Sequence, residues 1–276
     1  MDRAETSVTR LIKFCKPEHN VLCGAKLQIG TLNKYRLIED QELVDGNEGA
    51  FEFGLDFADD VELSQDWVNL LCPGIISISE PEHPSLTGSY EIDLDDFEVE
   101  ISIGSKRSVV ASAGASVKVR REMPNCFLFC MSKVDGPDEV SFAGYESSWS
   151  IAREFAKEFS NKVGNILWRS VTLSSFDPEV VKRLGISSTS ELELTCSFGP
   201  IDYRDRWTVV TNEQIADFRS FYDMIKVMYF YKPKSFEKDK EFRFIFRFSK
   251  CGVEVPPVVE DILIDVSSFI KPSDCS

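Results

Sequence analysis

Alternating apolar and polar residues dominate much of this chain and predict β-strands. Such segments occur at 11–15, 26–32, 50–57, 91–103, 108–119, 191–198, 206–210, 241–248 and 261–266. The compact apolar run at 126–132 is bounded by Pro124 and by the turn residues 135–137, which predicts a buried strand. Hairpin-like spacing is common, and strands and helices do not alternate regularly. We therefore predict an α+β fold with mostly antiparallel sheets and a few packed helices.

Helical spacing is confined to a few segments. Apolar residues recur every three or four positions from Trp149 to Ile166 and predict an amphipathic helix. A shorter helix follows the cap residue Asp177 and ends before Gly185, and others are expected near 17–23 and 212–224. Because internal repeats and low-complexity linkers are absent from the sequence, we predict a single domain over residues 1–276.

Charge is distributed unevenly along the 276 residues. The chain has 46 acidic and 31 basic side chains, and 19 of the acids lie between residues 37 and 105, where Lys and Arg are absent. The remainder therefore has 27 acids against 31 basic residues, so the predicted domain carries an acidic insertion at about 37–105. This insertion is interpreted either as a solvated face or as a docking surface for a basic partner.

Composition excludes several kinds of site. The two histidines are too few for a His-rich metal site, and neither a phosphate-loop motif nor a dinucleotide-binding glycine motif occurs. The eight cysteines form no C-x-x-C pair, so reduced, buried thiols are expected. Since no apolar run reaches the roughly 18 residues of a membrane span, we expect a cytoplasmic protein without a membrane partner.

The strand at 241–248 separates two kinds of side chain. Period-two geometry places its four phenylalanines on one face and Glu241, Arg243 and Arg247 on the other. Extended backward, the same alternation places Asp239 beside Glu241 at the entry to the strand. These charges form either cross-strand ion pairs or a catalytic carboxylate pair.

A second group of candidate residues lies near the N-terminus. Lys13 is in the first strand, His19 and Asn20 are in the short helix, and Tyr35 and Arg36 form part of a turn after the second strand. Each residue also has a structural interpretation: a capping Asn20, a packed or capping His19, a Tyr35 that covers the core, and an Arg36 that pairs with the nearby acids Glu39 or Asp40.

The order of these motifs resembles a known group of proteins. The chain contains a strand and then a helix with His-Asn. After these come, in order, the motifs L-x-x-G-T-L-x-x-Y-R, D-G-x-E-G, FLFCMS and K-P-x-x-F-x-x-D-K-E-F-R-F. This order is similar to an uncharacterised bacterial family with a late Lys, aromatic, Glu-Lys-Glu-aromatic-Arg motif. That family resembles ADP-ribosyltransferase-fold toxins, such as the DNA-modifying DarT family and mRNA-modifying toxins of phage defence.

The resemblance implies roles for individual residues. It makes Glu241 the catalytic glutamate and Arg36 a catalytic cation near the NAD phosphates or the transferred ribose. Lys13, His19, Asn20 and Tyr35 become cofactor-binding residues around NAD, which is a substrate. The family's first acid is here Asp239, a departure that leaves its role open. No metal is implied.

The implied function is that of an NAD-dependent ADP-ribosyltransferase, a toxin-like effector with an ADP-ribosyltransferase-like core. Its expected acceptor is a nucleic-acid base in RNA or DNA, with a protein side chain second, and an antitoxin or chaperone is an expected partner. A fixed carboxylate would stabilise the oxocarbenium-like charge that develops as nicotinamide leaves. The alternatives are a non-catalytic interaction module that uses the acidic stretch to bind a basic partner or to mimic nucleic acid, and a nucleotide sensor without turnover.

Overall fold

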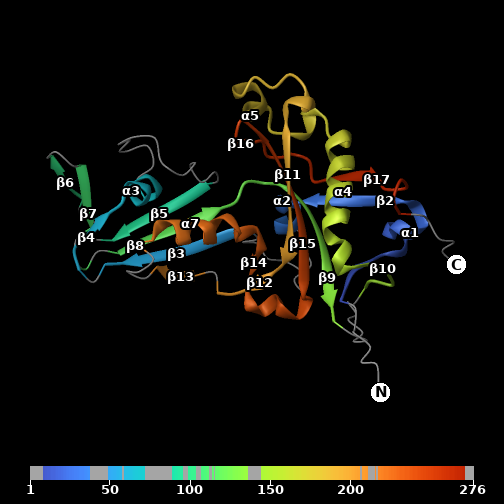
Figure 1. The fold of residues 1–276 in the computed structure, drawn as a ribbon, viewed down its shortest axis with the longest axis horizontal. Helices are drawn as coiled ribbons and strands as arrows, with labels where there is room; N and C mark the ends of the chain where they lie inside the picture. Colours follow the sequence, from blue (N-terminus) through green and yellow to red (C-terminus); the bar gives the residue numbers. More distant parts are fainter. Residues whose placement is uncertain are drawn as a thin grey trace, which may run out of the picture. The chain divides into compact units, whose positions relative to one another are not determined.

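The computed structural model describes residues 9–37, 49–57, 59–71, 89–95, 99–103, 107–111, 114, 116–135, 144–205, 207–210, 215 and 217–270. The chain forms two compact units. Unit 1 contains residues 1–48, 125–203 and 234–276, and unit 2 contains residues 49–124 and 204–233. The predicted α+β class with mostly antiparallel sheets is confirmed (Figure 1). The single domain with an insertion at 37–105 stays a prediction.

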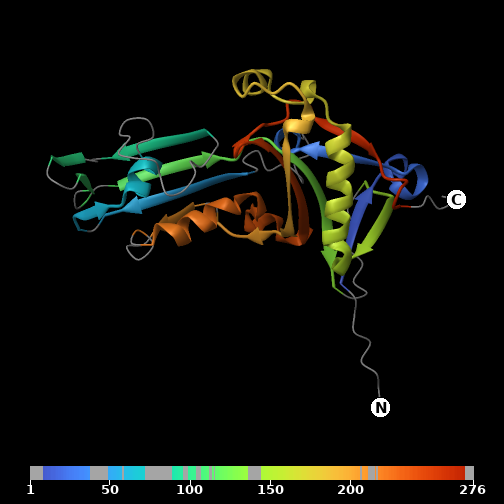
Figure 2. The ribbon, with the colours of Figure 1, turned by 45° about the horizontal axis from the view of Figure 1, so that its top comes forward.

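Unit 1 is built on one curled sheet. Among the described residues its strand order is β10-β1-β9-β15-β11, with β2 on β9, β17 on β2 and β16 on β15. All of these pairs are antiparallel (Figure 2). The bounds are β1 Arg10–Cys15, β2 Lys26–Thr31, β9 Phe127–Val134, β10 Ser147–Ala152, β11 Glu193–Pro200, β15 Glu241–Lys250, β16 Val253–Glu254 and β17 Asp261–Asp265.

Short helices and one long helix complete unit 1. They are η1 Pro17–His19, α1 Val21–Gly24, α2 Leu32–Leu37, η2 Arg153–Phe155, α4 Ala156–Ser170, η3 Leu173–Ser175, α5 Pro178–Arg183, η4 Thr189–Glu191 and η6 Lys234–Asp239, and the two-residue strand β12 is Asp202–Tyr203. The core contains the buried face of α4 and the four phenylalanines of β15, as the alternation predicted. Phe159 of α4 meets Phe244 edge to face at 5.0 Å between ring centroids.

Unit 2 has its own core. Its sheets are β13-β3-β8-β5 and β4-β7-β6, in which only β13 and β3 run parallel among the described strands. Trp67 packs on Phe221 at 4.7 Å between ring centroids. The bounds are β3 Ala50–Asp56, β4 Val61–Leu63, α3 Gln65–Leu71, β5 Ser89–Asp95, β6 Val99–Ile103, β7 Arg107–Ala111, β8 Ser116–Glu122, β13 Trp207–Val210, α7 Phe218–Lys226, η5 Met228–Phe230 and β14 Tyr231–Lys232.

One predicted helix begins later than the sequence pattern suggested. Trp149 lies in β10 and α4 begins at Ala156, because the segment 147–151 also alternates with a period of two and pairs with β1. Of the helix expected over 212–224, the described part comprises the helical residue Ile215 and α7, which begins at Phe218 after the cap Asp217. The short helix near 17–23 is divided at Asn20 into η1 and α1.

The cysteines differ in part from the expectation. Cys23 is disulfide-bonded, so a reduced thiol is wrong for this residue. The other cysteines of the described residues are free thiols, namely Cys15, Cys126, Cys130, Cys196 and Cys251. Cys251 is exposed rather than buried.

Candidate functional site in unit 1

A split between β1 and β2 creates the candidate site. β1 pairs with β9 only from Arg10 to Ile12 and then continues beside β10 as far as Cys15. β2 joins the same edge of β9 further along, at Gly30 and Thr31. The intervening residues 129–131 of β9 lie between these two pairings, so β1 and β2 diverge there. The divergence leaves a pocket of about 280 Å3.

The lining of this pocket combines basic and aromatic side chains. The basic residues are Lys13, Lys16, His19 and Lys34, and the aromatic residues are Phe14, Tyr35, Phe129, Tyr145 and Trp149. The Lys13 ammonium lies 5.0 Å from the centroid of the Phe129 ring. Lys34 pairs with Asp261, whereas Lys13 and Lys16 form no ion pair within the described residues. Such a lining suits a ligand that carries both an aromatic ring and an anionic group.

Helix α2 carries Tyr35 and Arg36 to the sheet. The sequence predicted a turn here, but the backbone N–H of Leu32 donates to the Cys126 carbonyl at 2.9 Å, and that of Asn33 donates to the Asn125 side chain at 2.9 Å. These bonds satisfy N–H groups that a helix start otherwise leaves unpaired, which favours helix over turn. Tyr35 packs on Gly30, where a Cβ atom would lie only 3.1 Å from the Tyr35 ring.

Glu241 is held in a buried ion pair. The Arg243 Nε atom donates to its carboxylate at 2.5 Å, and the side chains of Arg243 and Glu241 are only 2% and 10% exposed. The backbone N–H of Glu241 donates to the Tyr203 hydroxyl at 2.6 Å. Because a carboxylate buried without a partner would take up a proton, the adjacent guanidinium favours an ionised Glu241.

Tyr35 of the pocket wall and Cys130 of β9 lie near this ion pair. The negative charge of Glu241 acts on both the Tyr35 hydroxyl and the Cys130 thiol. Burial, together with the nearby negative charge of Glu241, raises the pKa of both the Tyr35 hydroxyl and the Cys130 thiol. Both groups are therefore neutral at physiological pH. Glu241 itself is not among the described residues that line the pocket.

Arg36 lies toward the Cys126 end of the pairing between β9 and β15, away from Glu241. Its Nη1 atom donates to the Asn33 side chain at 3.1 Å. Its positive charge acts on the thiol of Cys126, whose pKa burial raises to about 12. Cys126 and Cys130 are four residues apart, which along a strand is about 13 Å. Arg36 is therefore nearer the Cys126 end, Glu241 nearer the Cys130 end, and Arg36 is not among the described lining residues.

Asn20 and His19 have different surroundings. The Asn20 side chain caps α1 by accepting from the Leu22 N–H at 2.9 Å, and it donates to the Ser147 hydroxyl at 2.7 Å. Asn20 therefore caps α1, which is the structural alternative that the sequence predicted, and it also joins α1 to β10. His19 is exposed and lines the pocket. Glu39 and Asp40, the acids predicted as ion-pair partners of Arg36, lie outside the described residues.

Asp239 is not where the alternation placed it. It ends the 3-10 helix η6, and Lys240 has a φ of 45° before β15 begins at Glu241. The left-handed backbone at Lys240 interrupts the strand, so period-two geometry does not extend to Asp239. Asp239 is nevertheless buried, at 6% exposure.

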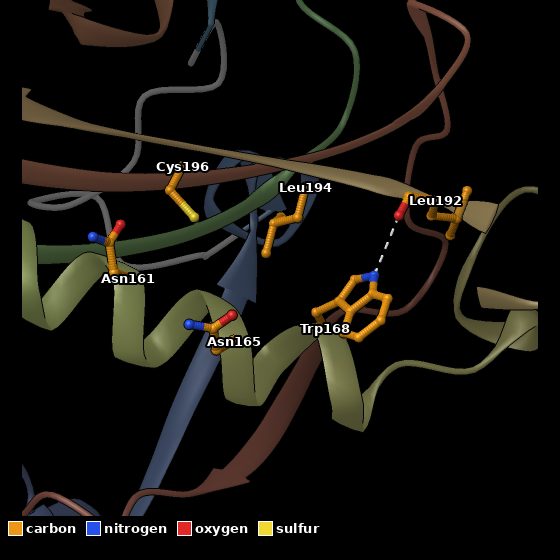
Figure 3. Close-up of a pocket in the computed structure, with 6 residues that line it drawn as sticks. All are labelled: Asn161, Asn165, Trp168, Leu192, Leu194 and Cys196. Carbon is orange, nitrogen blue, oxygen red and sulfur yellow. Dashed lines mark hydrogen bonds between the residues drawn. The ribbon is translucent and has the colours of Figure 1, made fainter. Parts of the chain in front are cut away.

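A larger cavity of about 380 Å3 lies elsewhere in unit 1, between α4 and β11. Figure 3 shows Asn161 and Asn165 of α4 facing Leu194 and Cys196 of β11, with the Trp168 indole N–H donating to the Leu192 carbonyl at 3.3 Å. The described residues that line it include no charged side chain and no candidate site residue predicted from the sequence. The smaller pocket is therefore the better candidate for chemistry on an anionic ligand.

Sequence reasoning missed Cys130 and Arg243 as parts of the site. Arg243 was visible as the residue two positions after Glu241 on the same strand face. Cys130 became a neighbour only through the pairing of β9 with β15, which places it opposite Arg243.

Comparisons with known proteins identify no relative: no family model, no curated protein and no solved structure matches the chain. Within the described residues, no helix has the length and apolar character needed to cross a bilayer. The same residues contain no group of three His, Cys, Asp or Glu side chains arranged to hold a metal ion.

Proposed function

We propose that this protein is an NAD-dependent ADP-ribosyltransferase with an ADP-ribosyltransferase-like core. The observation that carries the proposal is the connection between two features of unit 1. One is the pocket with basic and aromatic walls, and the other is the buried carboxylate of Glu241, whose negative charge acts on Tyr35 of the pocket wall.

The pocket lining suits parts of NAD. Lys13 and Lys16, which have no acidic partner among the described residues, suit a pyrophosphate, and the aromatic walls suit a nicotinamide or adenine ring. A volume of about 280 Å3 is near the lower end for ligand pockets. We therefore expect this pocket to enclose only part of the dinucleotide.

Glu241 supplies the chemistry in this proposal. When the nicotinamide–ribose bond breaks, positive charge develops on the ribose and the electron pair leaves with nicotinamide. A preorganised carboxylate stabilises that charge, and the acceptor nucleophile then attacks the sugar carbon and loses its proton. Because the charge of Glu241 acts on Tyr35, we expect the reacting ribose to approach the wall that Tyr35 forms.

The acceptor and the partners remain as the resemblance implied them. We propose a nucleic-acid base in RNA or DNA as the acceptor, a toxin-like role in phage defence or a toxin–antitoxin system, and neutralisation by an antitoxin or chaperone. The part of the acidic stretch that lies in β3 supports a solvated face, since Glu52 pairs with Arg120 at 3.0 Å in unit 2.

The proposal is tested with labelled NAD and total cellular RNA, DNA and protein. Transfer of label to RNA or DNA is expected, and Lys13→Gln should reduce it by at least tenfold. Lys26→Gln is the matched control, because Lys26 is exposed on β2 and does not line the pocket. If the folded wild type neither labels an acceptor nor hydrolyses NAD, the proposal is wrong.

A further inference from the structure

Strand β11 forms an edge of the sheet of unit 1. Among the described strands it pairs only with β15, from Glu193 to Pro200, and none of its residues is buried. Proteins usually protect such an edge with lysines, bulges, inward-pointing charges or a covering element. β11 has one charged residue, Glu193 at its start, and Pro200 ends it. The backbone between these two residues is therefore open to pairing with another strand.

The hydrogen bonds of β15 show which residues of β11 face the open edge. β16 lies along the edge of β15 opposite to β11, because Ser249 pairs with both strands. The carbonyl of Phe248 accepts from the Val255 N–H at 2.8 Å, so the backbone groups of Phe248 point toward β16. Leu194, which is opposite Phe248, therefore directs its N–H and C=O away from β15.

The same assignment extends along the strand. Hydrogen-bonded and non-hydrogen-bonded pairs alternate in an antiparallel ladder, so Leu194, Cys196 and Phe198 all direct their backbone groups to the open edge. No hydrogen bond to these groups occurs within the described residues. Ile201 belongs to the other set, and its N–H donates to the Glu241 carbonyl at 2.9 Å, which agrees with the alternation.

The open stretch is symmetric about Cys196. Before it, the Leu192 N–H donates to the Thr189 carbonyl at 3.1 Å, and the Leu192 carbonyl accepts from the Trp168 indole N–H at 3.3 Å (Figure 3). After it, Pro200 has no N–H to donate. Cys196 lies midway between Leu192 and Pro200, so the three open residues are centred on Cys196.

We propose that β11 pairs antiparallel with β11 of a second copy of this chain, about a two-fold axis at Cys196. In this isologous contact Leu194 is opposite Phe198 of the second copy, and Cys196 is opposite its own equivalent. Each open residue then exchanges both of its backbone hydrogen bonds with the residue opposite. The inference does not depend on the proposed function, because no described residue that lines the pocket between β1 and β2 belongs to β11 or α4.

The side chains of β11 suit self-pairing in this register. Leu194 and Phe198 place apolar groups opposite each other, on the face that carries the phenylalanines of β15. On the other face the hydroxyls of Thr195 and Ser197 are opposite each other, and Glu193 is opposite a glycine. The pairing therefore brings no like charges together along the strand, although the chain has a net charge of −15.

The groove beside β11 also suits a second copy. The cavity of about 380 Å3 is lined on its helical side by Asn161, Asn165 and Trp168, which Figure 3 shows beside β11. The two-fold axis of an antiparallel pair is perpendicular to the sheet, so the grooves of both copies lie on one face of the joined sheet. Their uncharged linings meet without charge repulsion. Because strand addition alone buries little surface, we expect a dimer of micromolar affinity.

Sedimentation velocity of the full chain tests the pairing. Over about 1 to 500 μM the sedimentation coefficient should rise from that of a monomer to that of a dimer, the range expected for a small interface. Thr195→Glu combined with Ser197→Glu should weaken the dimer about tenfold, because each new carboxylate is opposite another across the axis. Lys26→Glu is the matched control, because it changes the net charge equally at an exposed position of β2.

Opposite charges test the register. Thr195→Lys combined with Ser197→Lys should also weaken self-association. Mixing this variant with the double glutamate variant should restore a dimer that contains one copy of each, because every Lys is then opposite a Glu. Failure of the mixture to form a dimer would refute the register centred on Cys196.

Amide hydrogen exchange of the wild type, followed by NMR, needs no variant. The amides of Leu194, Cys196 and Phe198 should exchange more slowly at high than at low protein concentration, whereas those of Thr195 and Ser197 should be protected at both because they donate to β15. A dimer that leaves the first three amides unprotected would use another surface and would overturn the inference. A monomer at every concentration would also overturn it, and would leave a strand of another protein as the occupant.

Discussion

Strand β15 carries four phenylalanines on one face and Glu241, Arg243 and Arg247 on the other, and both faces are buried along most of the strand. The aromatic face packs into the core of unit 1. The other face buries an ion pair that apolar residues of similar volume could replace without loss of stability. The aromatic face is therefore explained by folding, whereas the charged face is where a functional explanation is required.

The largest effect that tests this comparison is expected on the charged face. Arg243→Leu should lower the free energy of unfolding by about 3–5 kcal/mol, because it leaves Glu241 charged and buried without its guanidinium. Adding Glu241→Leu should recover most of this loss, as measured by denaturant unfolding. Failure of the double variant to recover would mean that the pair is required for folding.

A substitution on the aromatic face should cause a loss of stability that no second substitution recovers. Phe244 is 0% exposed and meets Phe129, Phe159, Phe198 and Phe242 at 5.0–6.2 Å between ring centroids. Phe244→Ala should cost about 3–5 kcal/mol through lost burial and the cavity left behind. Denaturant midpoints measure it, and a loss below about 1 kcal/mol would contradict close packing of this face.

A smaller loss of stability should follow when a methyl group is added at the close contact between α4 and β11. A Cβ atom on Gly164 would lie 2.6 Å from the Cys196 sulfur, so Gly164→Ala should cost about 1–3 kcal/mol. Cys196→Ala in the same chain should relieve part of the loss. Gly24→Ala is the matched control, because its Cβ would meet nothing within 4 Å. Equal melting temperatures for the two glycine variants would refute the tight contact.

The smallest effect is a dependence of stability on alkaline pH, to which the buried thiols near the charged face should contribute. Burial raises the pKa of the Cys126 thiol from 9.0 to about 12, and it also raises the pKa of the Cys130 thiol and of the Tyr35 hydroxyl. The folded state then keeps protons that the unfolded state releases. This contribution to the free energy of unfolding is fully present below pH 9 and is lost as the pH rises from 9 toward 12. Unfolding free energies between pH 7 and 11 should fall less in Cys126→Ala. An unchanged slope would contradict the prediction.

The sequence could predict β15 well because its alternation is a local property of the chain. The same local pattern misplaced Asp239, since one left-handed residue, Lys240, ended the alternation. It also placed Tyr35 in a turn, because the bonds from Asn125 and Cys126 that begin α2 come from a segment about 90 residues away. Long-range pairing was invisible in the sequence.

The candidate site was recovered only in part for the same reason. Lys13, His19 and Tyr35 line one pocket, and the negative charge of Glu241 acts on Tyr35 of its wall. Asn20 caps a helix and Arg36 lies toward Cys126, positions that depend on how distant strands pair. The roles implied for all of these residues remain predictions.

Release of nicotinamide from NAD by matched glutamate variants tests the account most directly. Glu241→Asp keeps the charge beside Arg243 but withdraws the carboxylate by one methylene, so it avoids the unpaired arginine that Glu241→Gln would leave. Glu254→Asp is the control, because Glu254 forms the ion pair with Arg247 of β15, at 3.0 Å. We predict at least a hundredfold lower kcat for Glu241→Asp and a wild-type rate for Glu254→Asp. Equal rates in the two folded variants would contradict a catalytic Glu241.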